Sequence, residues 1–176
     1  MVHYVMKRKV FSFTRRFTIE NGEGEAMFSV NGAGYGLGFG RFDLRDTQGD
    51  ILATICREFL SLGRAYAIRR ADKAVVTVGM KRPDLTKVLG AGFEPLFSPS
   101  NLAFTATIPG GGNWVIERNL TGVTYEFKRG NEAIATFTER EFSIAGIFDV
   151  NIAGGEDDIL ILACAAAMLF MHRRKQ

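Results

Sequence analysis

The sequence predicts a mostly β domain in which about twelve short strands enclose one apolar helix near the C-terminal end. Three observations lead to this fold class. Up to about residue 152, short runs of alternating apolar and polar residues are separated by Gly and Asn. Residues 159–171 are then continuously apolar. The 176 residues, of which 47% are apolar and 23% charged, suit one globular domain covering residues 1–176.

The alternation is clearest at 123–128, where every second residue from Val123 falls on one face of the expected strand. That strand leads through Gly130-Asn131 into a second one, because Gly and Asn accept the positive φ of a tight hairpin. The same reasoning along the chain predicts strands near 3–10, 15–21, 25–31, 38–46, 50–58, 64–71, 74–81, 102–108, 112–118, 123–129, 132–140 and 146–152.

Residues 82–101 interrupt this pattern near the middle of the chain. They contain three of the four prolines, and 84–89 have the composition of one or two helical turns. On either side of this segment, Ala53-Thr54-Ile55 recurs as Ala135-Thr136-Phe137, and Arg57-Glu58-Phe59 recurs as Arg140-Glu141-Phe142. The offsets of 82 and 83 residues differ by one, as a β-bulge or a changed turn would produce. We therefore expect two similar β halves.

The apolar run follows the acids Glu156-Asp157-Asp158 and precedes His172-Arg173-Arg174-Lys175. Acidic residues at the start and basic residues at the end suit a helix dipole. A helix that is apolar on every side must lie in a bilayer or inside protein. Thirteen residues rise about 20 Å, which is short for a bilayer but matches a strand of six or seven residues. We expect a core helix at about 157–173, buried in a barrel, and no transmembrane span.

Several motifs form one set: Tyr4–Ser12 with Phe17-Thr18-Ile19, Asp46–Gly49 with Arg57-Glu58-Phe59, and Phe148–Ile152 with Asp158–Ala163. Together they resemble LURP-one-related proteins over nearly the whole chain. The resemblance implies a closed, twelve-stranded antiparallel barrel around a central C-terminal helix, the fold of tubby C-terminal domains that is also proposed for phospholipid scramblases. Residues 90–112 and the glycines from Gly32 to Gly40 depart from the family pattern.

Two motifs invite a ligand-binding interpretation. The alternating glycines from Gly32 to Gly40 lack the spacing of a phosphate loop, so a strand or bulge open to close approach is favoured. Asp149, Asn151 and the acids at 156–158 resemble the calcium-responsive stretch of scramblases. An EF-hand ligand set is absent from them, and dipole capping explains the acids more simply.

No residues form a catalytic or metal-binding pattern, so we assign none and expect no cofactor and no enzymatic activity. His3 and His172 lie at opposite ends of the chain. Cys56 and Cys164 are expected to be reduced thiols, because the chain does not begin with a signal-peptide pattern and a cytoplasmic location is favoured. The net charge of +3 is too small to predict a nucleic-acid partner.

Basic residues occur in short groups at 7–9, 15–16, 69–70 and 81–82. Neighbouring residues on a strand face opposite ways, so each pair presents about one charge outward. The first two segments are expected to adjoin, which predicts a shared basic face made of Lys7, Lys9 and one of Arg15 and Arg16. The alternative interpretation is scattered charge that serves solubility.

The favoured hypothesis is a non-enzymatic binding module that recognises anionic phospholipid or phosphoinositide headgroups through Lys7, Lys9, Arg15 and Arg16, peripherally at a membrane. It follows from analogy with tubby domains, and a fold alone does not establish a function. One alternative is a scramblase-like lipid transport protein, which requires the helix to leave the barrel and expose its apolar interior. Another is a structural or protein-interaction domain. The sequence specifies no protein partner.

Overall fold

A computed structural model describes residues 1–8, 17–32, 40–58, 65–80, 103–119, 123–140 and 146–172. Twelve strands in these ranges form one closed antiparallel barrel in which each strand pairs with its neighbours in the chain and β1 pairs with β12. The strands are β1 (Val2–Arg8), β2 (Phe17–Asn21), β3 (Ala26–Gly32), β4 (Arg41–Asp46), β5 (Ile51–Glu58), β6 (Ala65–Arg70), β7 (Lys73–Met80), β8 (Ala103–Thr107), β9 (Trp114–Arg118), β10 (Thr124–Arg129), β11 (Glu132–Glu139) and β12 (Ile147–Ile152).

All twelve predicted strands are confirmed, with boundaries that agree within three residues. The predicted hairpin at Gly130-Asn131 is also confirmed, because Arg129 pairs with Glu132 and Gly130 has a φ of 61°. The helical turns expected at 84–89 and the glycines between 33 and 39 lie outside the described residues.

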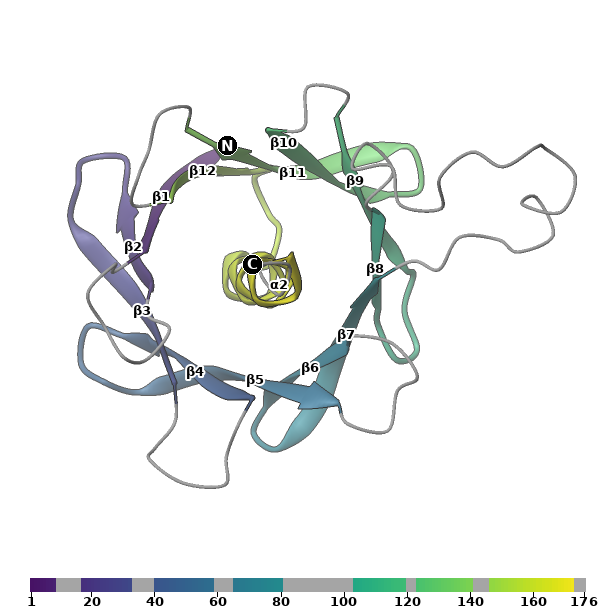
Figure 1. Ribbon diagram of the computed structural model, residues 1–176, viewed down its shortest axis with the longest axis horizontal. Helices are drawn as coiled ribbons and strands as arrows, with labels where there is room; N and C mark the ends of the chain where they lie inside the picture. Colours follow the sequence, from purple (N-terminus) through teal and green to yellow (C-terminus); the bar gives the residue numbers. More distant parts are fainter. Residues whose placement is uncertain are drawn as a thin grey trace, which may run out of the picture.

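The C-terminal helix, α2 (Asp158–His172), runs through the centre of the ring (Figure 1). Every side chain from Ile161 to Met171 is at most 8% exposed. This confirms the predicted enclosed helix. No helix in the described part of the chain has both the length and the apolar character that crossing a membrane requires.

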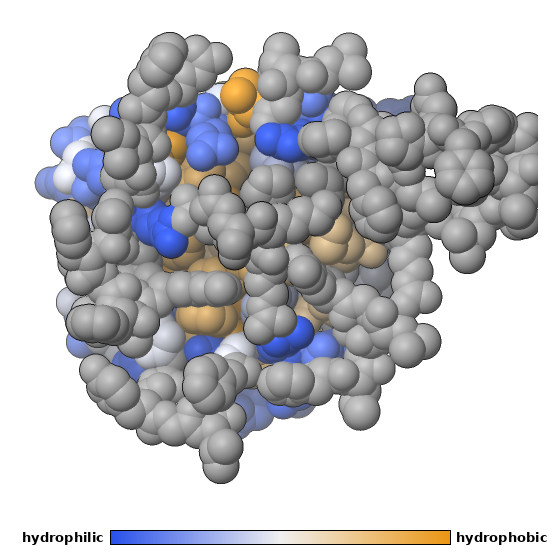
Figure 2. Space-filling view, in the orientation of Figure 1, coloured by the Kyte–Doolittle hydropathy of each residue, from blue (hydrophilic) through white to orange (hydrophobic). Residues whose placement is uncertain are grey.

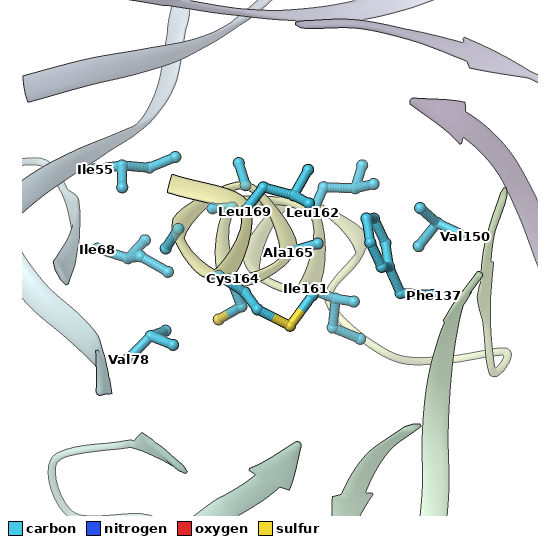
Figure 3. Close-up of a cluster of buried hydrophobic side chains, with 14 of the residues drawn as sticks. Ile55, Ile68, Val78, Phe137, Val150, Ile161, Leu162, Cys164, Ala165 and Leu169 are labelled. Carbon is cyan, nitrogen blue, oxygen red and sulfur yellow. The ribbon is translucent and has the colours of Figure 1, made fainter. Parts of the chain in front are cut away.

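Inward-facing side chains of the strands fill the space between the barrel wall and α2. In Figure 3 the helix lies between Ile55, Ile68 and Val78 on one side and Phe137 and Val150 on the other, and each of these five side chains is fully buried. Near the end of the helix, Phe170 stacks on Phe42 with ring centroids 3.9 Å apart. The space-filling view shows apolar side chains toward the centre and hydrophilic ones around the rim (Figure 2).

The two expected halves occupy equivalent positions in the barrel. Ala53-Thr54-Ile55 lies on β5 and Ala135-Thr136-Phe137 lies on β11, six strands further along the ring. The register skips Leu52 in the β4–β5 hairpin and Ile134 in the β10–β11 hairpin, so both hairpins carry a bulge 82 residues apart. The shared bulge supports a repeat of six strands.

Acidic residues attach the start of α2 to three strands. We call this set the helix anchor: Glu156, Asp157 and Asp158 with their partners Arg129, Arg70 and Tyr4. Both carboxylate oxygens of Asp157 accept hydrogen bonds from Arg70, at 2.5 and 2.6 Å. Arg129 pairs with Glu156, and the hydroxyl of Tyr4 donates to Asp158 at 2.8 Å.

Asp157 also caps the helix, because its Oδ1 accepts a hydrogen bond from the backbone N–H of Leu160 at 3.0 Å. Burial alone would raise the pKa of Asp157, but the hydrogen bonds from Arg70 and the backbone bring the net pKa below its usual value. Burial and the bond to Asp158 raise the pKa of Tyr4 to about 12. The acids therefore serve both the helix dipole and its attachment to the barrel.

We expect Asp157→Ala to lower the free energy of unfolding by about 1–2 kcal/mol, because it removes a helix cap and the Arg70 ion pair together. Asp157→Asn should lower it less, since the amide oxygen still caps the helix. Urea unfolding followed by circular dichroism would measure both. Equal losses for the two variants would show that the cap contributes nothing.

Candidate functional site

Of the predicted basic face, only Lys7 lies within the described residues; Lys9, Arg15 and Arg16 fall outside them. The expected pairing of the first two strands is confirmed, because Lys7 pairs with Thr18. The Nζ of Lys7 lies 2.5 Å from a carboxylate oxygen of Glu20, whose side chain is only 17% exposed. The charge of Lys7 is thus balanced by a neighbour on β2.

A second basic group lies on the outer surface of β4. Arg41, Asp43 and Arg45 alternate with Phe42 and Leu44, which belong to the core. Because side chains alternate across a strand, the three charged residues all face outward. Asp43 is nevertheless only 3% exposed, and it is the one buried charged residue in the described part of the chain.

Asp43 is enclosed by the residues around it. Its Oδ2 accepts a hydrogen bond from Nη2 of Arg45 at 2.9 Å. Its Oδ1 is 3.4 Å from Nε of Arg41 and 3.4 Å from the hydroxyl of Thr54 on β5. Nη1 of Arg45 also donates to the carbonyl oxygen of Gly49 at 2.9 Å. These contacts hold both guanidinium groups against one carboxylate.

A third arginine lies on the same surface. Thr54 pairs with Asp43 on one side and with Arg69 of β6 on the other, so these residues share the outer face. Arg69 is exposed and forms no ion pair with any described residue. As expected for neighbours on a strand, Arg70 points the other way and joins the helix anchor. We call Arg41, Asp43, Arg45 and Arg69 the β4–β6 arginine cluster.

The equivalent surface of the second half carries different charges. By strand pairing, Asp43 and Thr54 correspond to Glu126 and Thr136. Thr124, Lys128 and Asn151 occupy the positions of Arg41, Arg45 and Arg69. Glu117 occupies the position of Asn31, the β3 residue that pairs with Asp43. Lys128 lies 3.1 Å from both Glu117 and Glu126, and the hydrogen bonds that it donates to these glutamates raise its pKa. The fold therefore tolerates a surface here with no excess of positive charge.

Asp149 and the acids at 156–158, which resemble the calcium-responsive stretch of scramblases in sequence, do not gather at one point. Asp149 lies on the outer face of β12, where Arg140 donates to both its oxygens at 2.7 Å and His3 lies 3.0 Å away. The acids at 156–158 instead contact Arg129, Arg70 and Tyr4 within the helix anchor. No cluster of potential metal ligands occurs among the described residues.

The two cysteines are free and lie in different surroundings. Cys164 is buried in α2, and burial raises the pKa of its thiol above the usual value. Cys56 is half-buried on the outer face of β5, where it pairs with Arg41.

The fold and the comparison with known sequences agree. Residues 2–169 match the LURP-one-related family. The chain belongs to this family. It is also 27% identical over 171 residues to the uncharacterized protein YxjI of Bacillus subtilis (strain 168), and this similarity covers 97% of the chain and 93% of that protein. Membership of the LURP-one-related family thus accounts for the barrel and its helix without naming a ligand.

Asp149 provides a test of the outer ion pairs. Hydrogen bonds from Arg140 lower its pKa, so its ionised form stabilises the fold above the unfolded pKa of about 3.9. That contribution is lost as the pH falls through the lowered folded pKa. We expect Arg140→Gln to destabilise the protein slightly at neutral pH, because an exposed ion pair contributes little.

The difference between Arg140→Gln and wild type should shrink below about pH 4, because Asp149 is protonated first in the unfolded chains and then, at lower pH, in the folded wild type. Urea unfolding at a series of pH values would measure it, with the Asp149 carboxyl followed by NMR. A difference that stays constant down to pH 2 would contradict the assigned role of the ion pair.

Proposed function

We propose that this chain is a non-enzymatic binding module that holds anionic phospholipid headgroups at a membrane surface through the β4–β6 arginine cluster. One observation carries the proposal. Three arginines lie on the outer face of β4 and β6, two of them paired with the buried carboxylate of Asp43, and the equivalent surface on the other side has no excess of positive charge.

The charge and chemistry of the arginine cluster suit such a partner. The cluster carries two net positive charges, and each Lys or Arg near an anionic membrane contributes about 1 kcal/mol of attraction. Guanidinium groups bind phosphate oxygens through paired, directed hydrogen bonds, which an ammonium group cannot reproduce.

The position of the arginine cluster also favours binding without a large rearrangement. All four residues lie on β4 and β6, and both strands pair with β5 in the closed barrel, so the backbone that carries them is fixed by ladder hydrogen bonds. A ligand would therefore meet a preformed surface, and less conformational entropy would be lost on binding.

The proposal predicts that Arg41→Gln/Arg69→Gln weakens binding to anionic vesicles by roughly 30-fold, because two attractions of about 1 kcal/mol each are lost. The matched control is Lys128→Gln/Arg140→Gln, which removes the same charge from β10 and the end of β11 across the barrel (Figure 1). Sedimentation with phosphatidylserine/phosphatidylcholine vesicles at low and physiological salt measures binding.

Wild-type binding should weaken as salt rises, since exposed charges are screened over about 8 Å at physiological ionic strength. Equal losses in the two double variants would mean that only net charge matters and would sink the proposed surface. Absence of wild-type binding to anionic vesicles at either salt would reject the membrane function itself.

A further inference from the structure

We infer that the β4–β6 arginine cluster recognises a phosphomonoester, a terminal phosphate group, rather than negative charge in general, and that Asp43 is the positioning residue of this site. The inference rests on the proposed function and concerns the chemistry of the same surface. It is carried by the burial of Asp43 and by the donors that its contacts leave available.

The negative charge of Asp43 weakens the positive charge that a purely electrostatic anion-binding surface would need. An outward-facing strand position can hold almost any residue, and an acid here removes a third of the positive charge of the arginine cluster. Yet Asp43 is 3% exposed, and its two oxygens face Arg41, Arg45 and Thr54. Burying a carboxylate is unfavourable unless its partners satisfy it. What it provides is orientation, because it draws two arginines at positions i−2 and i+2 toward one point.

The oriented arginines retain donors for a ligand. Arg41 uses its Nε toward Asp43, and its two terminal nitrogens contact no acceptor among the described residues. Arg45 uses one hydrogen of each terminal nitrogen, toward Asp43 and Gly49, and each of these nitrogens carries a second hydrogen. Arg69, one strand beyond Thr54, adds a further guanidinium on the same face.

A phosphomonoester matches this arrangement better than a phosphodiester does. It carries a charge of about −1.5 to −2 at pH 7 and three strong acceptor oxygens, against two net positive charges and three guanidinium groups. A phosphodiester offers a single negative charge and two free oxygens. The site is thus matched in charge and in number of donors to a terminal phosphate.

Asp43→Asn separates positioning from charge, because the two predict different effects on selectivity. On charge alone the variant is more basic and should bind every anionic vesicle more tightly, with its preference unchanged. If Asp43 positions the arginines, the preference itself should fall. The probes are phosphatidic acid, a lipid phosphomonoester, and phosphatidylserine, each diluted in phosphatidylcholine to the same zeta potential.

We expect the wild type to prefer phosphatidic acid by about tenfold, the effect of one charge-assisted hydrogen bond. Asp43→Asn should bind phosphatidylserine at least as well as wild type while losing most of this preference. Glu126→Gln is the matched control, since it makes the same charge change at the equivalent position of the second half. It should keep the wild-type preference.

Three outcomes would overturn the inference: a wild type without preference at matched zeta potential, a preference unchanged in Asp43→Asn, or an equal loss in Glu126→Gln. If all anionic vesicles bind equally and Arg41→Gln/Arg69→Gln weakens binding to all of them, the membrane function stands and phosphomonoester recognition is rejected.

Calorimetry with glycerol 3-phosphate tests whether the phosphomonoester belongs to a soluble molecule or to a lipid headgroup. Tight binding of this soluble probe without vesicle binding would support phosphate recognition and reject the membrane. Thermal unfolding would establish that each variant is folded.

Discussion

Enclosure of an apolar helix is the constraint on which this structure depends. From Ile161 to Met171 the helix has no polar face to turn toward water, so it is stable only where protein surrounds it. A single sheet could cover one side of it. Closing the sheet into a ring covers all sides and also pairs the edge strands β1 and β12, which would otherwise present unpaired backbone groups. The closed barrel and the buried helix therefore require each other.

Because the interior serves folding, the chemistry of the molecule is left to its outer face and its two ends. The helix anchor strengthens this division, since Arg70, Arg129 and Tyr4 attach the start of α2 to three different strands. A scramblase-like mechanism would have to break these contacts and expose the aromatic lining around Phe170 to water. A surface function needs neither step, which is why we place the proposed site on the outer wall.

The fold was predictable from the sequence because its signals are local. Alternation identifies each strand, and helix length distinguishes a barrel interior from a bilayer. The site was less predictable because it depends on register. The sequence did not indicate that Glu20 would lie beside Lys7, or that Arg69 would lie one strand from Thr54. The alternation of Arg41, Asp43 and Arg45 was visible, but an exposed and a buried acid look identical in a sequence.

Comparison of the two six-strand halves shows which positions the fold constrains and which it leaves free to vary. Positions that pack against the helix keep their character in both halves, as Leu44 and Phe127 do, because the core constrains them. Outward positions are free of that constraint. Asp43 and Glu126 are acids at equivalent positions, each paired with a threonine, yet one is enclosed by arginines and the other shares a lysine with a second glutamate. Packing against the helix does not require this difference, so the arginines on β4–β6 are free to serve the anion binding that we propose.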